Sequence, residues 1–217
     1  MIVAGVVLGL VAGRRSSGSP GGESMLASIN PLGERARGNR WGSTVTAYTL
    51  AAMTAAAVVG GALGGVGRAA GVGGRWPLAA LGAAAVIAGA ADLRSPGSFL
   101  TTGRQVDERW LVRYRGWVYG AGFGAQLGTG VATVITSATV YAWLAATALS
   151  GSARAGALVG ASFGMGRSVP FVAVAGVRAA PELRVRLRRL TVWSGAGRSV
   201  AAGINLAVGA ACLAVRV

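Results

Sequence analysis

The chain has 217 residues, of which 53% are apolar and only 12% are charged, and its mean hydropathy is +0.57. This composition excludes an ordinary water-soluble domain, whose surface needs many more charged side chains. The net charge of +15 comes from 21 basic residues, all arginine, that flank apolar runs; there they orient helices and meet anionic lipid headgroups, so no nucleic-acid partner is expected.

Six apolar runs separate the charged clusters, and we interpret them as about six transmembrane helices of an all-α polytopic membrane bundle. They lie at residues 1–13, 42–67, 76–91, 116–150, 155–177 and 192–215. The first run is short, because a helix of 13 residues covers only about 20 Å. The fourth run exceeds one span and offers a break at Gly128 to Gly130, so two short helices there are the competing interpretation.

The arginines are unevenly divided between the loops. The first, third and fifth loops hold 15 arginines, whereas the alternate loops and the C-terminus hold four. Because cytoplasmic loops are enriched in arginine, this bias predicts a multi-pass protein of the plasma (cytoplasmic) membrane with both termini outside the cytoplasm. If the first run does not span, only the N-terminus changes sides.

We expect a single transmembrane domain over residues 1–217 that divides into two halves. Residues 1–93 form the first three-helix half, 116–217 the second, and 94–115 the cytoplasmic connecting loop. Each half begins with an element interrupted by helix-breaking residues, around Asn30-Pro31 in the first and at Gln126 to Gly130 in the second. Interruptions at corresponding positions indicate a central site between two inverted repeats.

Glycines recur every four residues on three of the expected helices. They are Gly60 and Gly64 or Gly61 and Gly65 on the second, Gly116, Gly120, Gly124 and Gly128 on the fourth, and Gly156, Gly160 and Gly164 on the fifth. Such stripes let helix backbones approach closely, which favours tight packing in lipid. The alternative is that they let helices slide during alternating access.

Arg167 lies near the middle of the fifth run, where a guanidinium is costly and usually pairs or lines a polar cavity. Pro170 cannot donate a hydrogen bond to the carbonyl of Gly166, so we expect a kink that exposes backbone carbonyls to a ligand or to Arg167. Two roles are open for Arg167. It either forms a structural pair with Asp92 or Glu34, or it contacts a substrate or anion.

Polar residues at the two interruptions complete the candidate substrate-binding set. Glu34 follows the Asn30-Pro31 turn at the expected membrane edge, where it can pair with Arg35 or Arg37 or form a gate. Hydroxyl residues of the fourth run suit interhelical hydrogen bonds, a polar pathway or back-bonding to helix carbonyls. The candidate set is Arg167, Pro170, Gln126, Thr129, Asn30 and Glu34.

Side chains suited to catalysis or metal binding are scarce. The chain has no histidine and no lysine, and Cys212 is its only cysteine. The usual general base, Schiff-base amine and zinc imidazoles are therefore missing, and a cysteine pair or multi-cysteine metal site cannot form. We expect a protein that is not an enzyme and that binds no cofactor or metal.

The stretch from Gly120 to Gly128, followed by that from Gly156 to Phe171, resembles the fourth span and the glycine-rich, proline-ended fifth span of the CcdA/DsbD transmembrane family of the LysE-type superfamily. That family carries electrons across the membrane through a cysteine pair. Here Asn30 precedes Pro31 and Gln126 to Gly130 occupy the second position, so no thiol stands at either place. The resemblance implies the scaffold without its redox chemistry.

Two functions from different classes follow. The first is a small-solute transporter or permease with a midplane site around Arg167, Pro170 and the broken fourth span. The second is a non-transporting accessory membrane subunit that helps assemble or mature an extracytoplasmic redox enzyme, and it requires a membrane or extracytoplasmic protein partner. Membrane lipid, including anionic headgroups at the arginine loops, is a partner in both.

Overall fold

The computed structural model describes residues 1–18, 20–94, 109–132 and 134–215, and all regular structure within these ranges is α-helical. Among the described residues, four helices are long and apolar enough to cross a membrane: α4 (Trp41–Ala69), α5 (Trp76–Arg94), the kinked pair Ala153–Val174, and Gly195–Ala214 in α12 (Ser194–Ala214). An all-helical membrane protein is thus supported. The count of six spans and the inverted repeat stay predictions, because the other apolar helices are shorter.

The predicted first and fourth spans are both short in the structure. α1 (Ile2–Ser16) has 15 residues, and the run 116–150 is divided into α7 (Gly116–Gly128) and α8 (Thr139–Leu149). The break has a local cause, since Gly130 has a φ of 75° and the side-chain oxygen of Thr129 accepts the N–H of Ala132 at 3.2 Å. The competing interpretation of the fourth run, two short helices, is the one that the structure contains.

Pro170 divides the predicted fifth span into α9 (Ala153–Ser168) and α10 (Pro170–Val174). Proline has no N–H, so the carbonyl of Gly166 instead accepts the N–H of Val169, in a long bond of 3.4 Å. The expected break in the helix is present at this position.

The remaining helices are short or amphipathic. They are α2 (Pro20–Ser28), α3 (Pro31–Ala36), α6 (Trp110–Arg113) and α11 (Ala180–Val192). On α11, three leucines pack against a buried cluster of the bundle while Arg184 and Arg188 are exposed. Of the predicted connecting loop 94–115, residues 95–108 lie outside the described residues.

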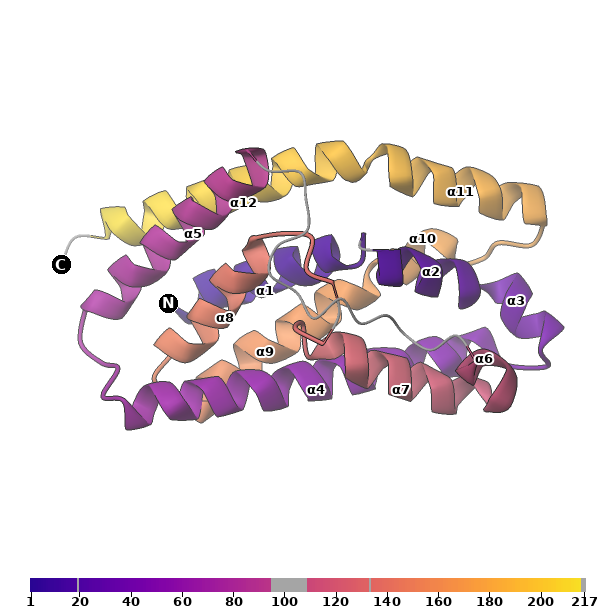
Figure 1. The fold of residues 1–217 in the computed structure, drawn as a ribbon, viewed down its shortest axis with the longest axis horizontal. Helices are drawn as coiled ribbons and strands as arrows, with labels where there is room; N and C mark the ends of the chain where they lie inside the picture. The colour runs from indigo at the N-terminus through magenta and orange to yellow at the C-terminus, as the bar shows by residue number, and fades with distance from the viewer. Residues whose placement is uncertain (19, 95–108, 133, 216–217) are drawn as a thin grey trace.

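The bundle has two unlike ends (Figure 1). The start of α1, the turn from α4 to α5, the turn from α8 to α9 and the end of α12 lie at one end. The short helices α3 and α6 and the start of α11 lie at the other, together with the arginines that flank them. The arginine-rich segments therefore collect away from the end that holds the two termini.

Helix α4 packs against both α7 and α9 along a single stripe of buried residues that runs from Thr44 to Gly67. A Cβ added to Gly128 of α7 would lie 2.4 Å from the carbonyl oxygen of Ala52, and one added to Gly164 of α9 would lie 2.4 Å from the same oxygen. Further along, a Cβ on Gly60 would meet the carbonyl of Gly156 at 2.3 Å, and the reverse contact would be 2.2 Å. The predicted glycine stripes are therefore sites of backbone-to-backbone packing.

The alternative pair of glycines on α4, Gly61 and Gly65, does not take part in this close backbone packing. A Cβ on Gly65 would have no heavy atom within 4 Å, and one on Gly61 would meet the carbonyl of Ala153 at an ordinary 3.4 Å. Gly60 and Gly64 thus make the closest backbone contacts, whereas Gly61 lies at the edge of the interface with α9 and Gly65 lies off it.

The substitution Gly164→Ala is expected to destabilise the protein, because its methyl group would lie 2.5 Å from the backbone nitrogen of Met53. Overpacking of this kind costs about 2 kcal/mol and should lower the Tm in detergent by several degrees. The matched control Gly65→Ala meets nothing within 4 Å and should leave the Tm unchanged or slightly raise it, since alanine favours helix. Equal effects of the two substitutions would contradict this packing.

Candidate functional site

Glu34 is fully buried where α3 meets α4 and α7. Its Oε1 is 2.6 Å from a guanidinium nitrogen of Arg37 and also accepts the hydroxyl of Tyr119. Its Oε2 accepts the hydroxyl of Thr44 at 2.7 Å. The predicted local pair of Glu34 with Arg37 is therefore present, and it forms one part of a network that joins three helices.

Asn30 and Asn39 hold the backbone around this carboxylate. Asn30 caps α3, since its side-chain oxygen accepts the N–H groups of Leu32 and Gly33 at 3.1 and 2.9 Å. Asn39 accepts the N–H of Gly116 at 3.1 Å, at the start of α7. The candidate residue Asn30 is thus occupied as a helix cap and presents its side chain to the backbone.

The pKa of Arg37 is raised above its usual value. Burial on its own would lower this pKa, but hydrogen bonds with Glu34 and Tyr119 favour the charged guanidinium and outweigh it. The Arg37 guanidinium therefore stays charged over the whole physiological pH range.

A second buried carboxylate, Asp92, joins α5 to the first turn of α8. It accepts the hydroxyl of Ser137 at 2.6 Å, the N–H of Ala138 at 2.6 Å and the hydroxyl of Thr139 at 2.9 Å. Asn205 of α12 donates to the hydroxyl of Thr139 at 2.9 Å. The negative charge sits at a helix N-terminus, where the N–H groups and helix dipole favour it.

Arg167 of α9 is 3% exposed, and its Nε and one Nη have no hydrogen-bond partner within the described part of the chain. The guanidinium carbon lies 5.9 Å from the centre of the Phe163 ring, which supplies a cation–π contact. The expected pairing with Asp92 or Glu34 is not formed, because the oxygens of both carboxylates are bound to other donors.

The six candidate residues do not gather into one site. Thr129 donates its hydroxyl to the carbonyl of Gln126 at 2.9 Å and so caps the end of α7. Glu34 lies at the opposite end of α7, where its Oε2 would be 2.9 Å from a Cβ on Gly116. Asn30 lies with Glu34, whose N–H donates to its carbonyl at 2.9 Å. Pro170 is buried at the kink, two residues after Ser168, where α9 ends.

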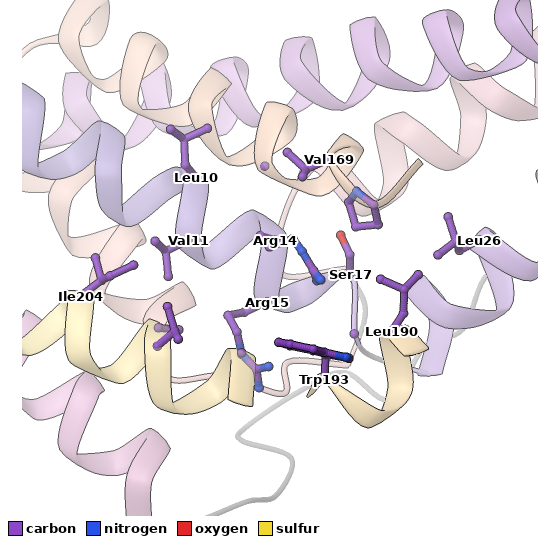
Figure 2. Close-up of a pocket in the computed structure, with 16 residues that line it drawn as sticks. Leu10, Val11, Arg14, Arg15, Ser17, Leu26, Val169, Leu190, Trp193 and Ile204 are labelled. Atoms are coloured by element: carbon purple, nitrogen blue, oxygen red, sulfur yellow. The ribbon is translucent and has the colours of Figure 1, made fainter. Parts of the chain in front are cut away.

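A pocket of about 400 Å³ opens between α1, α10, α11 and α12 (Figure 2). Apolar side chains make most of its wall, among them Leu10, Val11, Pro170, Trp193 and Ile204. Arg14 and Arg15 add positive charge from the last turn of α1. No group of three or more His, Cys, Asp or Glu side chains suited to a metal ion occurs among the described residues.

The chain is similar in sequence to several proteins named methylamine utilization protein MauF. It is 31% identical to the one from Methylophilus methylotrophus over 180 residues, 76% of this chain and 60% of that protein. For the Paracoccus versutus protein the identity is 33% over 175 residues, 76% of this chain and 63% of the relative. For the Methylorubrum extorquens protein it is 29% over 213 residues, 95% of this chain and 73% of the relative.

These matches extend over about three fifths of the length of the first two relatives. No family model matches the chain. No solved structure matches it.

The resemblance to the CcdA/DsbD transmembrane family is wrong. The relatives found by sequence carry the MauF name instead. In the stretches that suggested the resemblance, Gly120 to Gly128 and Gly156 to Phe171, the recurring features are six glycines that pack on α4 and the proline kink. The glycines serve close helix packing, which unrelated membrane bundles share.

The substitution Thr44→Val is expected to lower stability, because it leaves the buried Oε2 of Glu34 without its hydroxyl donor. Loss of a donor to a buried charged acceptor costs about 1–3 kcal/mol. Thr49→Val on the same helix removes only a bond from its hydroxyl to the carbonyl of Val45, and it should change stability by less than about 0.5 kcal/mol. Thermal unfolding of both variants in detergent would measure the difference, and two equal shifts would rule out the network as a stabilising contact.

Proposed function

We propose that this chain is an accessory membrane protein that helps assemble or mature an extracytoplasmic redox enzyme for the oxidation of methylamine or a related small amine. The observation that carries the proposal is the similarity to methylamine utilization proteins from three organisms, which extends over 95% of this chain in one of them. Use of an amine as a nutrient requires oxidation of its C–N bond, which is redox chemistry.

The packing of the bundle supports a fixed scaffold more than a transporter. Alternating access requires one set of helices to move against another around a central polar site. Here α4 touches α7 and α9 through backbone atoms, with Ala52 in contact with both Gly128 and Gly164. The carboxylates of Glu34 and Asp92 are bound by hydroxyl, amide or guanidinium donors, and the pocket beside α1 is mostly apolar. These features favour the accessory role.

The protein is proposed to act without catalysis of its own and without a cofactor, since it has neither histidine nor lysine and a single cysteine. We place it in the plasma membrane with the arginine-rich end in the cytoplasm and both termini outside, as the charge bias between loops favours. An extracytoplasmic partner would then meet the end that carries the α4–α5 and α8–α9 turns (Figure 1).

Arg167 is proposed as the interior residue that this function requires. A buried guanidinium with two nitrogens that lack a hydrogen bond lowers the stability of the fold. Residues that cost stability are commonly retained for function. Pro170, three residues further on, has no N–H for the carbonyl of Gly166, which accepts the N–H of Val169 at 3.4 Å instead.

Deletion of the gene in the source organism is expected to abolish methylamine oxidation in the extracytoplasmic fraction, while uptake of labelled methylamine by whole cells is unchanged. The measurement is dye-linked amine oxidation, with the amount of enzyme followed by immunoblot and a plasmid copy of the gene as the complementation control. Normal oxidation together with lost uptake would support transport and overturn the accessory role.

The substitution Arg167→Met is expected to raise the Tm by a few degrees, since a side chain of similar length replaces a buried charge that lacks hydrogen bonds. The same substitution should reduce the amount of mature enzyme in the complemented deletion strain. Arg154→Met, at the exposed start of the same helix, should change neither value. A lower Tm for Arg167→Met would show that the guanidinium stabilises the fold.

A further inference from the structure

The pocket beside α1 has walls suited to hydrocarbon. Val11 of α1 points toward Ile204 of α12, and Leu10 points toward Val169 (Figure 2). Pro170 and Val200 also line the pocket. Its volume of about 400 Å³ is in the range of pockets that hold small ligands. A polar solute would gain little from these walls, whereas an alkyl chain would be removed from water or would replace loosely packed lipid.

Positive charge is concentrated at the same pocket. Arg14 and Arg15 are consecutive residues of the last turn of α1, and both line it. Arg15 reaches toward α12, where a Cβ on Gly197 would lie 3.7 Å from its Nη1 (Figure 2). Arg198, the next residue of α12, adds a further positive charge that acts on Arg15.

Asp92 of α5 acts electrostatically on Arg15. Both oxygens of Asp92 are already bound to the first turn of α8 by hydrogen bonds of 2.6 to 2.9 Å. Arg14 and Arg198 also act on Arg15, with positive charge. The described residues that line the pocket include Arg14 and Arg15 and no aspartate or glutamate, so the charge of the pocket suits an anionic occupant.

We propose that this pocket binds one anionic phospholipid of the surrounding bilayer, a role separate from the proposed maturation of an enzyme. Its phosphate lies at Arg14 and Arg15, and one acyl chain lies against Leu10, Val200 and Ile204. Basic pockets between transmembrane helices are known to hold anionic headgroups, and juxtaposed arginine and apolar groups match the two parts of a phospholipid. Trp193 at the pocket wall supplies the amphipathic ring that is typical of the headgroup level.

The test uses the full chain in nanodiscs of phosphatidylcholine alone or with phosphatidylglycerol, and native mass spectrometry after mild detergent extraction. We expect retention of one phosphatidylglycerol per protein and a higher Tm in the phosphatidylglycerol discs. The double substitution Arg14→Gln and Arg15→Gln should reduce retention at least tenfold and abolish the Tm difference. The control Arg75→Gln and Arg154→Gln changes two exposed arginines, one in the turn between α4 and α5 and one in the first turn of α9, and it should retain the lipid.

Two further measurements distinguish binding of a lipid in this pocket from general electrostatic attraction of anions to the protein. Val200→Phe, which reduces the space for an alkyl chain and leaves both arginines in place, should also reduce retention. Inorganic phosphate added to phosphatidylcholine discs should not raise the Tm. A rise in Tm with phosphate equal to that with phosphatidylglycerol would show a site for free anions and would overturn the proposal. Equal retention of phosphatidylglycerol by the wild type and by both double variants would also overturn it. If the double variant of Arg14 and Arg15 fails to fold, the proposal is tested on the wild type alone. The measurements are then the retention of phosphatidylglycerol and the Tm with phosphatidylglycerol or with phosphate.

Discussion

The structure depends on the close approach of three helix backbones along α4. Glycines of α7 and α9 place their Cα atoms directly against carbonyl groups of α4, so that an added Cβ on Gly124 would lie 2.2 Å from the carbonyl of Tyr48 and one on Gly160 would lie 2.1 Å from that of Ala56. In lipid there is no hydrophobic force between helices, and this extensive van der Waals contact takes its place. Each helix keeps a fixed register on α4 because the contacting surfaces have no flexible side chains.

The buried polar networks follow from that fixed register. Tyr119 and Thr44 reach the same carboxylate, that of Glu34, only because α7 lies directly on α4 at Gly116 and Gly120. A wider spacing would leave the carboxylate with Arg37 alone and would expose a buried charge without enough donors. At this end of the bundle, the close packing of α7 on α4 and the hydrogen bonding of the Glu34 carboxylate therefore depend on each other. A side chain added to the glycine stripe would disturb both.

The sequence predicted those features whose cause is local. The glycine stripes, the break after Gly128, the interruption at Pro170 and the pair of Glu34 with Arg37 each arise within a few residues of the chain. The partners of Asp92 were not predicted, because Ser137 and Thr139 lie 45 and 47 residues away and meet it only through the packing of α5 against α8. The resemblance to the CcdA/DsbD family was wrong because it rested on glycine spacing. Glycine spacing reports how helices pack and says little about ancestry or chemistry.

The last turn of α1 connects the pocket to Arg167. The hydroxyl of Ser17 donates to the carbonyl of Arg167 at 3.0 Å, and a Cβ on Gly13 would lie 2.9 Å from the backbone nitrogen of the same residue. Arg14 and Arg15 are held in the pocket by the helical turn that makes these contacts. A lipid bound there would touch Pro170 on the flank of the kink and would brace the backbone that carries Arg167. Because a buried cation without hydrogen bonds favours any rearrangement that solvates it, such a brace would oppose that rearrangement and keep Arg167 in the interior.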